Sequence, residues 1–435
     1  MIAVLKEWIR FDQHWSKALF LPVLFVANAY YRTKTPLKHI EFLSSIFRLN
    51  WPGTFWLVNR EVTNRFLDQN RKIKENIYRD FLNDIDVIEK YKKFSDNPAE
   101  MLDGIVTIIA PSTKDSKGVL TIAYSYYFPL FLNYFDICEV EKHYHIVLEP
   151  SWNGLCDATI LPFTRLNNEV FVMAYEDRDY QYIEALSSNL VPLKLSANWW
   201  ISPEQFKQGL PIADRNIDII MVAAWAKFKR HDRFFDAIRT LKIQGEPINV
   251  TLVGYPNDLN MNDIKQLAAD YDISDQITFY EWISPEAVSD LLGRAKINII
   301  WSRFEGLNRA IIEGMFCDTP CILRKGFNFG MEYPYINSQT GVYATEKGLA
   351  PLISYMLQNP QDYSPRTYVL EKHNCYVATT ILADYIKKYD PSFDENSIVP
   401  KLSGLNGMEY LTDADARKFK SDYDLLKSLI TPRQA

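Results

Sequence analysis

Two glutamates, Glu305 and Glu313, stand eight positions apart in the segment SRFEGLNRAIIEGMF, residues 302–316. The preceding residues KINIIWS are apolar enough for a buried strand, and the following residues repeat apolar side chains at helical spacing. Eight helical residues rise about 12 Å, whereas the two carboxyl groups of glycoside hydrolases lie about 5 to 9.5 Å apart. The spacing therefore favours one carboxylate at each end of an elongated ligand, such as a nucleotide sugar, over a hydrolytic pair.

The turn between this strand and this helix is itself a candidate binding site. Glu305-Gly306 is expected to form the turn, and the helix is expected to begin near Leu307 or Asn308. The first turn of a helix has unpaired backbone N–H groups and the positive end of the helix dipole, which together bind phosphate. Gly306 lets a ligand approach the backbone closely. The segment therefore predicts an anion site at the end of a strand.

Such a site needs a sheet to position it, and the chain contains two series of apolar strands separated by helical segments. This alternation predicts an α/β fold with mainly parallel sheets and crossover helices. We expect an N-terminal domain over residues 1–198, a second domain over 199–390, and a C-terminal helix within 395–435 that packs back on the first. The expected strands are residues 104–110, 118–124, 144–150, 169–175 and 190–195, then 217–223, 248–254, 277–282, 297–302 and 320–324.

The bulk properties exclude several classes of protein. A chain of 435 residues is too long for one core and predicts two domains. The net charge of −6 offers no surface for nucleic acid. Five scattered cysteines fit a reducing cytoplasm better than a disulfide framework.

The N-terminal segment is the basic part of this acidic chain. Residues 1–50 hold seven Lys/Arg against three Asp/Glu, interleaved with apolar and aromatic residues. Their longest apolar run, about 14 residues, is shorter than the roughly 20 that span a bilayer, and it lacks the cleavage site of a signal peptide. Two interpretations stay open: peripheral contact with the inner face of a membrane, or a core helix with a solvated edge.

The residues EGLNRAIIE, followed by GMFCDTPCIL, resemble the Glu-x7-Glu motif of retaining GT-B glycosyltransferases of the large family numbered four, the group 1 type. The resemblance extends over roughly residues 215–360. It implies GT-B architecture, with two Rossmann-like doubly wound domains facing across a cleft. By this resemblance, Glu305 contacts hydroxyls of the donor sugar, the N–H groups of Gly306–Asn308 contact the sugar or diphosphate, and Glu313 holds the ribose diol.

The resemblance also implies a pair of cations in the first strand–helix loop, here AAWAKFKRHDRFF. The family's usual Gly-Arg-x-x-x-x-Lys-Gly is only partly kept. Lys229 matches the lysine, Arg230 replaces the glycine, and Ala224 stands where the arginine is expected. Lys229 is thus expected to bind the pyrophosphate, and the second cation is left open between Arg230, Lys227 and Arg309.

On the acceptor side, the stretch LEPSWNGLC follows a strand of the first domain. Glu149 is expected to hydrogen-bond acceptor hydroxyls and Trp152, beside Ser151, to stack on a sugar face; a structural turn with a buried tryptophan is the alternative. Asp177 and Asp179 match the Asp-x-Asp metal motif of another glycosyltransferase fold. Three-residue matches are common, so no metal site is predicted.

Taken together, the resemblance implies transfer of a hexose from a nucleoside-diphosphate sugar to a glycan or lipid-linked acceptor, with retained anomeric configuration. It implies that neither a metal nor another cofactor is required. It also implies a cytoplasmic enzyme of bacterial surface polysaccharide synthesis. Two alternatives stay open: a sugar-nucleotide 2-epimerase of the same fold, and a non-catalytic partner subunit derived from a transferase. The base, the sugar, the acceptor and the oligomeric state do not follow from the sequence.

Overall fold

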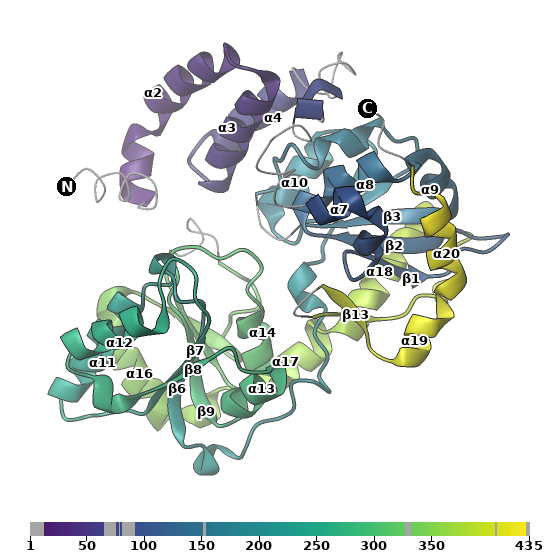
Figure 1. The fold of residues 1–435 in the computed structure, drawn as a ribbon. Coiled ribbons are helices and arrows are strands. Elements are labelled where there is room, and N and C mark those ends of the chain that lie inside the picture. The colour runs from purple at the N-terminus through teal and green to yellow at the C-terminus, as the bar shows by residue number, and fades with distance from the viewer. Residues whose placement is uncertain are drawn as a thin grey trace. The chain divides into compact units, whose positions relative to one another are not determined.

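The structure is a computed structural model that describes residues 13–64, 75–77, 79–80, 92–150, 154–326, 332–404 and 407–431. It divides into two compact units (Figure 1). The first comprises Met1–Trp200 and Cys375–Ala435, and the second comprises Ile201–Asn374. Along the described part of the chain, no helix is both long enough and apolar enough to cross a bilayer.

The first unit contains a five-stranded sheet in the order β1-β2-β3-β4-β5. The strands β2 to β5 pair in parallel, as predicted. The pair β1–β2 is antiparallel, which corrects the expectation of a crossover there. Only seven residues separate the two strands, too few for a parallel connection. The strands are β1 (Val106–Ala110), β2 (Gly118–Ala123), β3 (Tyr144–Glu149), β4 (Val170–Met173) and β5 (Leu190–Leu193).

Because these strands follow one another in chain order, right-handed crossovers place their helices on one face of the sheet. The other face is covered by α18 (Cys375–Tyr389), whose Ala378 and Leu382 are buried in one cluster with Val147 and Phe171 of the sheet. The sequence-based boundary at residue 390 had assigned α18 to the second domain. In the structure, it supplies the layer that the first sheet otherwise lacks.

The remaining helices of the first unit precede the sheet, connect its strands or follow α18. The C-terminal α20 packs back on the sheet, where the Tyr144 hydroxyl donates to Asp422 at 2.8 Å. A short hairpin, β12 (Lys401–Ser403) with β13 (Met408–Tyr410), precedes α19 and α20. The helices are α2 (Gln13–Arg32), α3 (Pro36–Arg48), α4 (Thr54–Val62), α7 (Lys92–Asp96), α8 (Phe128–Tyr134), α9 (Ile137–His143), α10 (Asp177–Ala185), α19 (Asp413–Lys418) and α20 (Lys420–Ser428).

The second unit contains a six-stranded parallel sheet in the order β11-β10-β9-β6-β7-β8. The chain winds outward from β6 to β8 on one side and from β9 to β11 on the other, so the sheet is doubly wound and Rossmann-like, as predicted. The winding reverses between β6 and β9. The strands are β6 (Ile217–Val222), β7 (Val250–Gly254), β8 (Ile277–Glu281), β9 (Ala295–Ile300), β10 (Cys321–Arg324) and β11 (Gly341–Ala344).

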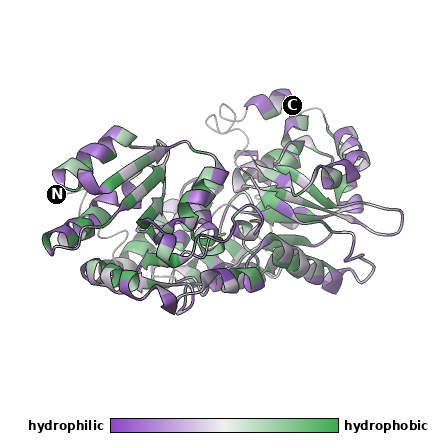
Figure 2. Cartoon of the chain, turned by 90° about the horizontal axis from the view of Figure 1, so that it is seen from below, coloured by the Kyte–Doolittle hydropathy of each residue, from purple (hydrophilic) through white to green (hydrophobic). Residues whose placement is uncertain are grey.

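Helices cover both faces of this sheet, and its strands are more hydrophobic than the helices around them (Figure 2). On one face, Ile219 and Met221 of β6 pack with Phe234 and Ile238 of α11 and with α16. On the other face, α14 packs against α13 and α17. The helices are α11 (His231–Ile243), α12 (Met261–Asp270), α13 (Pro285–Gly293), α14 (Arg309–Phe316), α16 (Leu349–Gln358) and α17 (Pro365–Lys372).

Candidate functional site: two loops at the reversal point

The loops that follow β6 and β9 meet at the carboxyl edge of the second sheet. Lys229 ends the short 3-10 helix Lys227–Lys229 after β6, and Glu305 lies in the loop after β9. The Lys229 Nζ is 2.6 Å from the Glu305 Oε1, and both side chains are largely buried. The strands are neighbours at the point where the winding reverses, which is where open α/β sheets bind ligands. The structure thus brings together two residues that the sequence placed 76 positions apart.

Three further contacts fix these two loops: one lies within the loop after β9, and two join it to the loop after β6. The Ser302 hydroxyl donates to the same carboxylate oxygen of Glu305. The Arg303 backbone N–H donates to the Phe228 carbonyl at 2.8 Å. The rings of Phe228 and Phe304 stack with centroids 5.0 Å apart. Glu305 is therefore held by fixed partners.

Arg324, at the end of β10, supports the same loop and was not predicted as a site residue. Its guanidinium donates to the carbonyls of Ser302 at 3.2 Å and Arg303 at 3.0 Å, and to that of Lys325 at 3.3 Å. Burial and, to a smaller extent, the neighbouring charge of Arg230 lower its pKa to about 10. The sequence did contain a sign of this residue, because the expected strand PCILR ends in an arginine at the carboxyl edge of the sheet.

Arg230 occupies the position where the family pattern has glycine. Its backbone is left-handed, with φ 58° and ψ 45°, a conformation that glycine adopts without strain. Its side chain forms an ion pair with Glu346 of the short helix Glu346–Gly348. The chain has therefore kept the glycine-type turn and added a cation at it.

The helix after Glu305 begins later than expected. Asn308 caps it by accepting the Ile311 N–H at 3.3 Å, and α14 starts at Arg309. The rise of about 12 Å estimated for eight helical residues therefore does not apply, because residues 305–308 are not helical. Gly306 remains in the loop, where its carbonyl accepts the Tyr333 hydroxyl at 3.0 Å, and Leu307 lies beside it, partly exposed.

Glu313 lies in the second turn of α14 and is buried. Arg309, one turn earlier, places its Nε 3.2 Å from the Glu313 Oε1. Burial raises the pKa of Glu313, and the positive charge of Arg309 opposes that rise. Of the candidates for a second cation, Arg309 is thus engaged with Glu313, whereas the Lys227 side chain is exposed. His231, the first residue of α11, is buried, and burial together with the charge of Lys229 lowers its pKa to about 3, so its imidazole is neutral at physiological pH.

Two aromatic side chains stand at the carboxyl ends of the neighbouring strands. Tyr255 follows β7 and Trp282 follows β8, and their ring centroids are 5.2 Å apart. Trp282 is 73% exposed. Behind them, the Trp225 indole N–H donates to Glu281 at 2.6 Å. This exposed pair offers a flat apolar surface on the same edge of the sheet as Lys229.

The structure does not support the expected acceptor role of Glu149. Its carboxylate is completely enclosed and forms an ion pair with the equally enclosed Lys401 at 2.5 Å. The Lys401 ammonium also lies 4.7 Å from the centre of the Trp200 ring. An acceptor hydroxyl has no route to a carboxylate packed in this way. Ser151 and Trp152 lie outside the described residues.

The aspartates of the Asp-x-Asp match have structural partners. Asp179 accepts the backbone N–H groups of Gly154 at 2.8 Å and Leu155 at 3.0 Å. Asp177 forms an ion pair with Lys194. In the described residues, no three His, Cys, Asp or Glu side chains gather as a metal site would require.

Residues 202–366 match the family model described as glycosyl transferases group 1. The matched segment contains both loops of the site, and it covers most of the second unit. Over these residues the chain is similar to the group 1 glycosyl transferases, as its motifs predicted. A comparison with curated protein sequences found no match for the chain.

Several solved structures are similar to this chain at low identity. Sucrose-phosphate synthase from Thermosynechococcus elongatus is 16% identical over 63% of this chain and 74% of its own, with a TM-score of 0.47. TarM of S. aureus is 12% identical over 62% of this chain and 55% of its own, with a TM-score of 0.48. The lipopolysaccharide outer core galactosyltransferase WaaB is 12% identical over 74% of this chain and 82% of its own, with a TM-score of 0.45. This chain thus spans about half the length of the TarM chain.

Proposed function

We propose that this glycosyltransferase moves a hexose from a nucleoside-diphosphate sugar to a glycan or lipid-linked acceptor with retention of anomeric configuration. The observation that carries the proposal is the contact of Lys229 with Glu305 at the reversal point of the second sheet. A buried cation there suits the diphosphate, and a carboxylate held beside it suits the hydroxyls of the attached sugar.

In this proposal, the diphosphate is bound by cations from two strand ends and by backbone N–H groups from a third. Lys229 and Arg230 follow β6, the N–H groups of residues 306–308 follow β9, and Arg324 ends β10. Arg324 takes the place of the family's arginine, whose position is filled here by the buried Ala224. A guanidinium has five N–H donors, and the contacts with Ser302, Arg303 and Lys325 use three of them.

The same arrangement supplies the chemistry. The bond between the anomeric carbon and the β-phosphate oxygen breaks, and negative charge develops on the leaving diphosphate. Fixed cations and backbone N–H groups stabilise that charge without a metal or another cofactor. The acceptor oxygen attacks from the same face, its proton passes to the leaving phosphate oxygen, and the configuration is retained. No nucleophile from the protein takes part.

The remaining parts of the donor have candidate partners on the same edge. Glu313 would accept hydrogen bonds from the ribose diol, which would also favour its ionised form. The exposed rings of Tyr255 and Trp282 would stack on the nucleobase. Neither contact discriminates between uridine and guanosine.

For the cellular setting, we propose a cytoplasmic enzyme of bacterial surface polysaccharide synthesis that works at the inner face of the membrane. The basic N-terminal segment supports this setting.

The test is the release of free nucleoside diphosphate from a panel of sugar nucleotides, with the full chain and without acceptor. We expect one donor to be hydrolysed, and we expect Lys229→Ala and Glu313→Ala to lose the hydrolysis. Lys207→Ala, which removes an exposed lysine of the same unit, is the matched control and should keep it.

Other outcomes identify the alternatives. A donor converted to an epimer would indicate the 2-epimerase. Binding of a nucleoside diphosphate without any turnover would indicate a strict requirement for the acceptor. If calorimetry finds no nucleotide binding at all, the enzyme proposal fails and the partner-subunit interpretation takes its place.

A further inference from the structure

The helices α2 and α4 carry a large share of the exposed hydrophobic side chains. Sixteen large hydrophobic side chains are exposed in the described part of the chain, and five of them belong to α2 and α4. We call these five the α2–α4 surface: Val23 (47% exposed), Phe25 (50%), Val26 (72%), Tyr30 (57%) and Trp56 (56%).

The side chains of the α2–α4 surface are those that stay exposed when these helices pack against one another and against α3. Leu24 and Asn28 form the buried side of α2, where Asn28 hydrogen-bonds His39 of α3 at 3.0 Å. The Tyr31 ring stacks on Phe42 of α3, with centroids 4.4 Å apart. The helix is thus oriented by its polar and aromatic contacts, and its other face points away from them.

This apolar surface has a positively charged margin. The described residues 22–64 contain five Lys/Arg and two Asp/Glu, a net charge of +3, whereas the whole chain carries −6. Lys34 lies over the Tyr30 ring at 4.5 Å, and Arg60 lies over the Trp56 ring at 4.4 Å. Tryptophan, tyrosine and long basic side chains beside aliphatic residues are the composition found where a protein meets lipid head groups.

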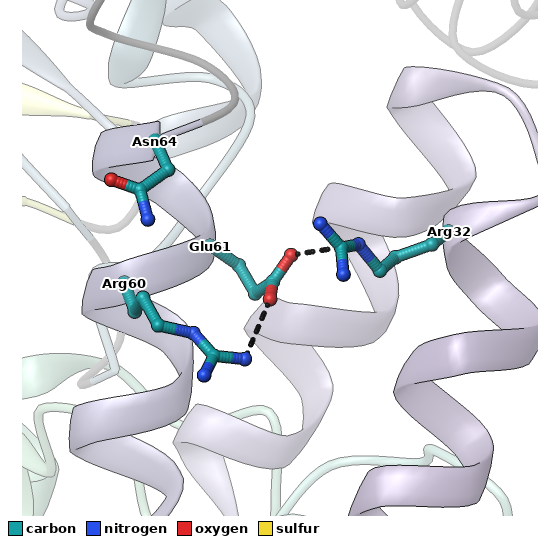
Figure 3. A pocket seen from close by; sticks show the side chains of 4 residues that line it. All are labelled: Arg32, Arg60, Glu61 and Asn64. Carbon is teal, nitrogen blue, oxygen red and sulfur yellow. Dashed lines mark hydrogen bonds and ion pairs between the residues drawn. The ribbon is translucent and has the colours of Figure 1, made fainter.

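One of the two acids in this segment is already neutralised. Glu61 is buried, and Arg32 and Arg60 contact its two carboxylate oxygens at 3.3 Å and 3.1 Å (Figure 3). These three residues and Asn64 line a cavity of about 710 Å³. Two guanidinium groups around one carboxylate leave a charge of +1 in this cavity, which suits the phosphate of a head group.

We propose that the α2–α4 surface binds the surface of an anionic lipid bilayer. Val23, Phe25 and Val26 enter the boundary between head groups and acyl chains, and Tyr30 and Trp56 lie at the level of the head groups. Lys34, Lys38 and the Arg32–Arg60 cavity bind lipid phosphates. The helix lies along the bilayer and does not cross it. The inference specifies the lipid surface for the proposed membrane setting, and its evidence is independent of the donor chemistry.

The test is co-sedimentation of the full chain with vesicles. We expect binding to vesicles of phosphatidylcholine with phosphatidylglycerol, and much weaker binding to phosphatidylcholine alone. Val26→Asp should abolish binding, because it places a charge where the apolar face enters the lipid. The matched control is Ile243→Asp, which makes the same change at a side chain that is 75% exposed on α11 of the second unit.

The cations are tested separately. Each Lys or Arg near an anionic surface strengthens binding about fivefold, so Lys34→Gln with Lys38→Gln should weaken it about 25-fold. Lys207→Gln, at an exposed lysine of the second unit, should have no effect. Thermal unfolding of all variants should match the wild type, since each changed side chain is exposed.

Two results would overturn the inference. One is the absence of binding between the wild-type chain and anionic vesicles, or equally strong binding by the wild type and by Val26→Asp. The other is a wild-type dimer that Val26→Asp dissociates, without vesicle binding, because the surface would then cover a second copy of the chain. Hydrolysis of a sugar nucleotide in solution does not depend on either result, so failure here removes the proposed membrane setting and leaves the proposed transfer reaction standing.

Discussion

Arg230 combines a strained backbone with a useful charge. A left-handed backbone costs an L-residue about 1–2 kcal/mol relative to its ordinary conformations, and glycine avoids that cost. The ion pair with Glu346 offsets little of it, because the Glu346 side chain is 48% exposed. An arginine retained at such a position is best explained by what its charge does for a ligand.

Replacing Arg230 by glycine should therefore separate stability from binding. We expect Arg230→Gly to raise the free energy of unfolding by about 1 kcal/mol, the relief of backbone strain less the greater freedom of glycine in the unfolded chain. Affinity for the nucleoside diphosphate should fall at the same time. Chemical denaturation and calorimetry measure the two effects. Arg230→Ala is the control that loses the charge and keeps the strain; unchanged nucleotide affinity in both variants would remove Arg230 from the site.

Glu313 should make stability depend on pH in a direction opposite to that of most carboxylates. Its pKa is raised in the folded chain by burial, so the folded state holds its proton to higher pH than the unfolded state does. Stability is therefore lost as pH rises from the ordinary glutamate pKa through the raised one.

We expect Glu313→Gln to be more stable than the wild type at neutral pH, and the difference to shrink at pH 4. Chemical denaturation of both proteins at neutral pH and at pH 4 measures this difference in stability. A variant that is less stable at neutral pH would show that Arg309 outweighs the cost of burial.

At the scale of elements, the end of β10 is coupled to the loop after β9 by Arg324. Three carbonyl contacts require the planar, branched donor of arginine, and lysine provides the charge alone. Arg324→Lys should therefore weaken binding of the nucleoside diphosphate about tenfold, the scale of one lost charged hydrogen bond. Binding of the nucleoside without phosphate should be unchanged.

Calorimetry with both ligands measures this difference. Arg294→Lys, at a partly exposed arginine that pairs with Asp290, is the matched control. Equal losses for nucleoside and nucleoside diphosphate would mean that Arg324 only supports the loop.

The elements that could be predicted from the sequence are those with a strong local pattern. All five expected strands of the second sheet are present. Four of them are largely buried, and buried parallel strands are continuous apolar runs. The fifth, the half-exposed edge strand β8, is marked by its β-branched and aromatic residues. The sixth, β11, has the short sequence GVYA and no such pattern. The Lys229–Glu305 contact follows from the loops after β6 and β9, once the order of the strands is known. Arg324 and Lys401 act through partners distant in sequence, which no local spacing reveals.

At the scale of the molecule, the C-terminal segment is a structural part of the first unit. It supplies α18 for the open face of the sheet and Lys401 for the enclosed Glu149. Removing one member of a buried ion pair leaves an uncompensated charge, at a cost of about 3–5 kcal/mol. We expect Lys401→Met to lower the free energy of unfolding by that amount.

Chemical denaturation of the full chain measures the effect. Glu149→Gln combined with Lys401→Met should recover most of the loss, since no charge then remains buried. A loss below about 1 kcal/mol in the single variant would place this pair among ordinary exposed ion pairs.

The division of the chain has a consequence for its synthesis. The first unit is completed only by Cys375–Ala435, whereas the second is continuous from Ile201 to Asn374. On the ribosome, the second unit therefore emerges whole while the first sheet still has one face uncovered. Domains generally fold as units during synthesis, and exposed apolar surface favours aggregation. We infer that the second unit folds first, and that the nascent first unit is the part of the newborn chain that chaperones must protect.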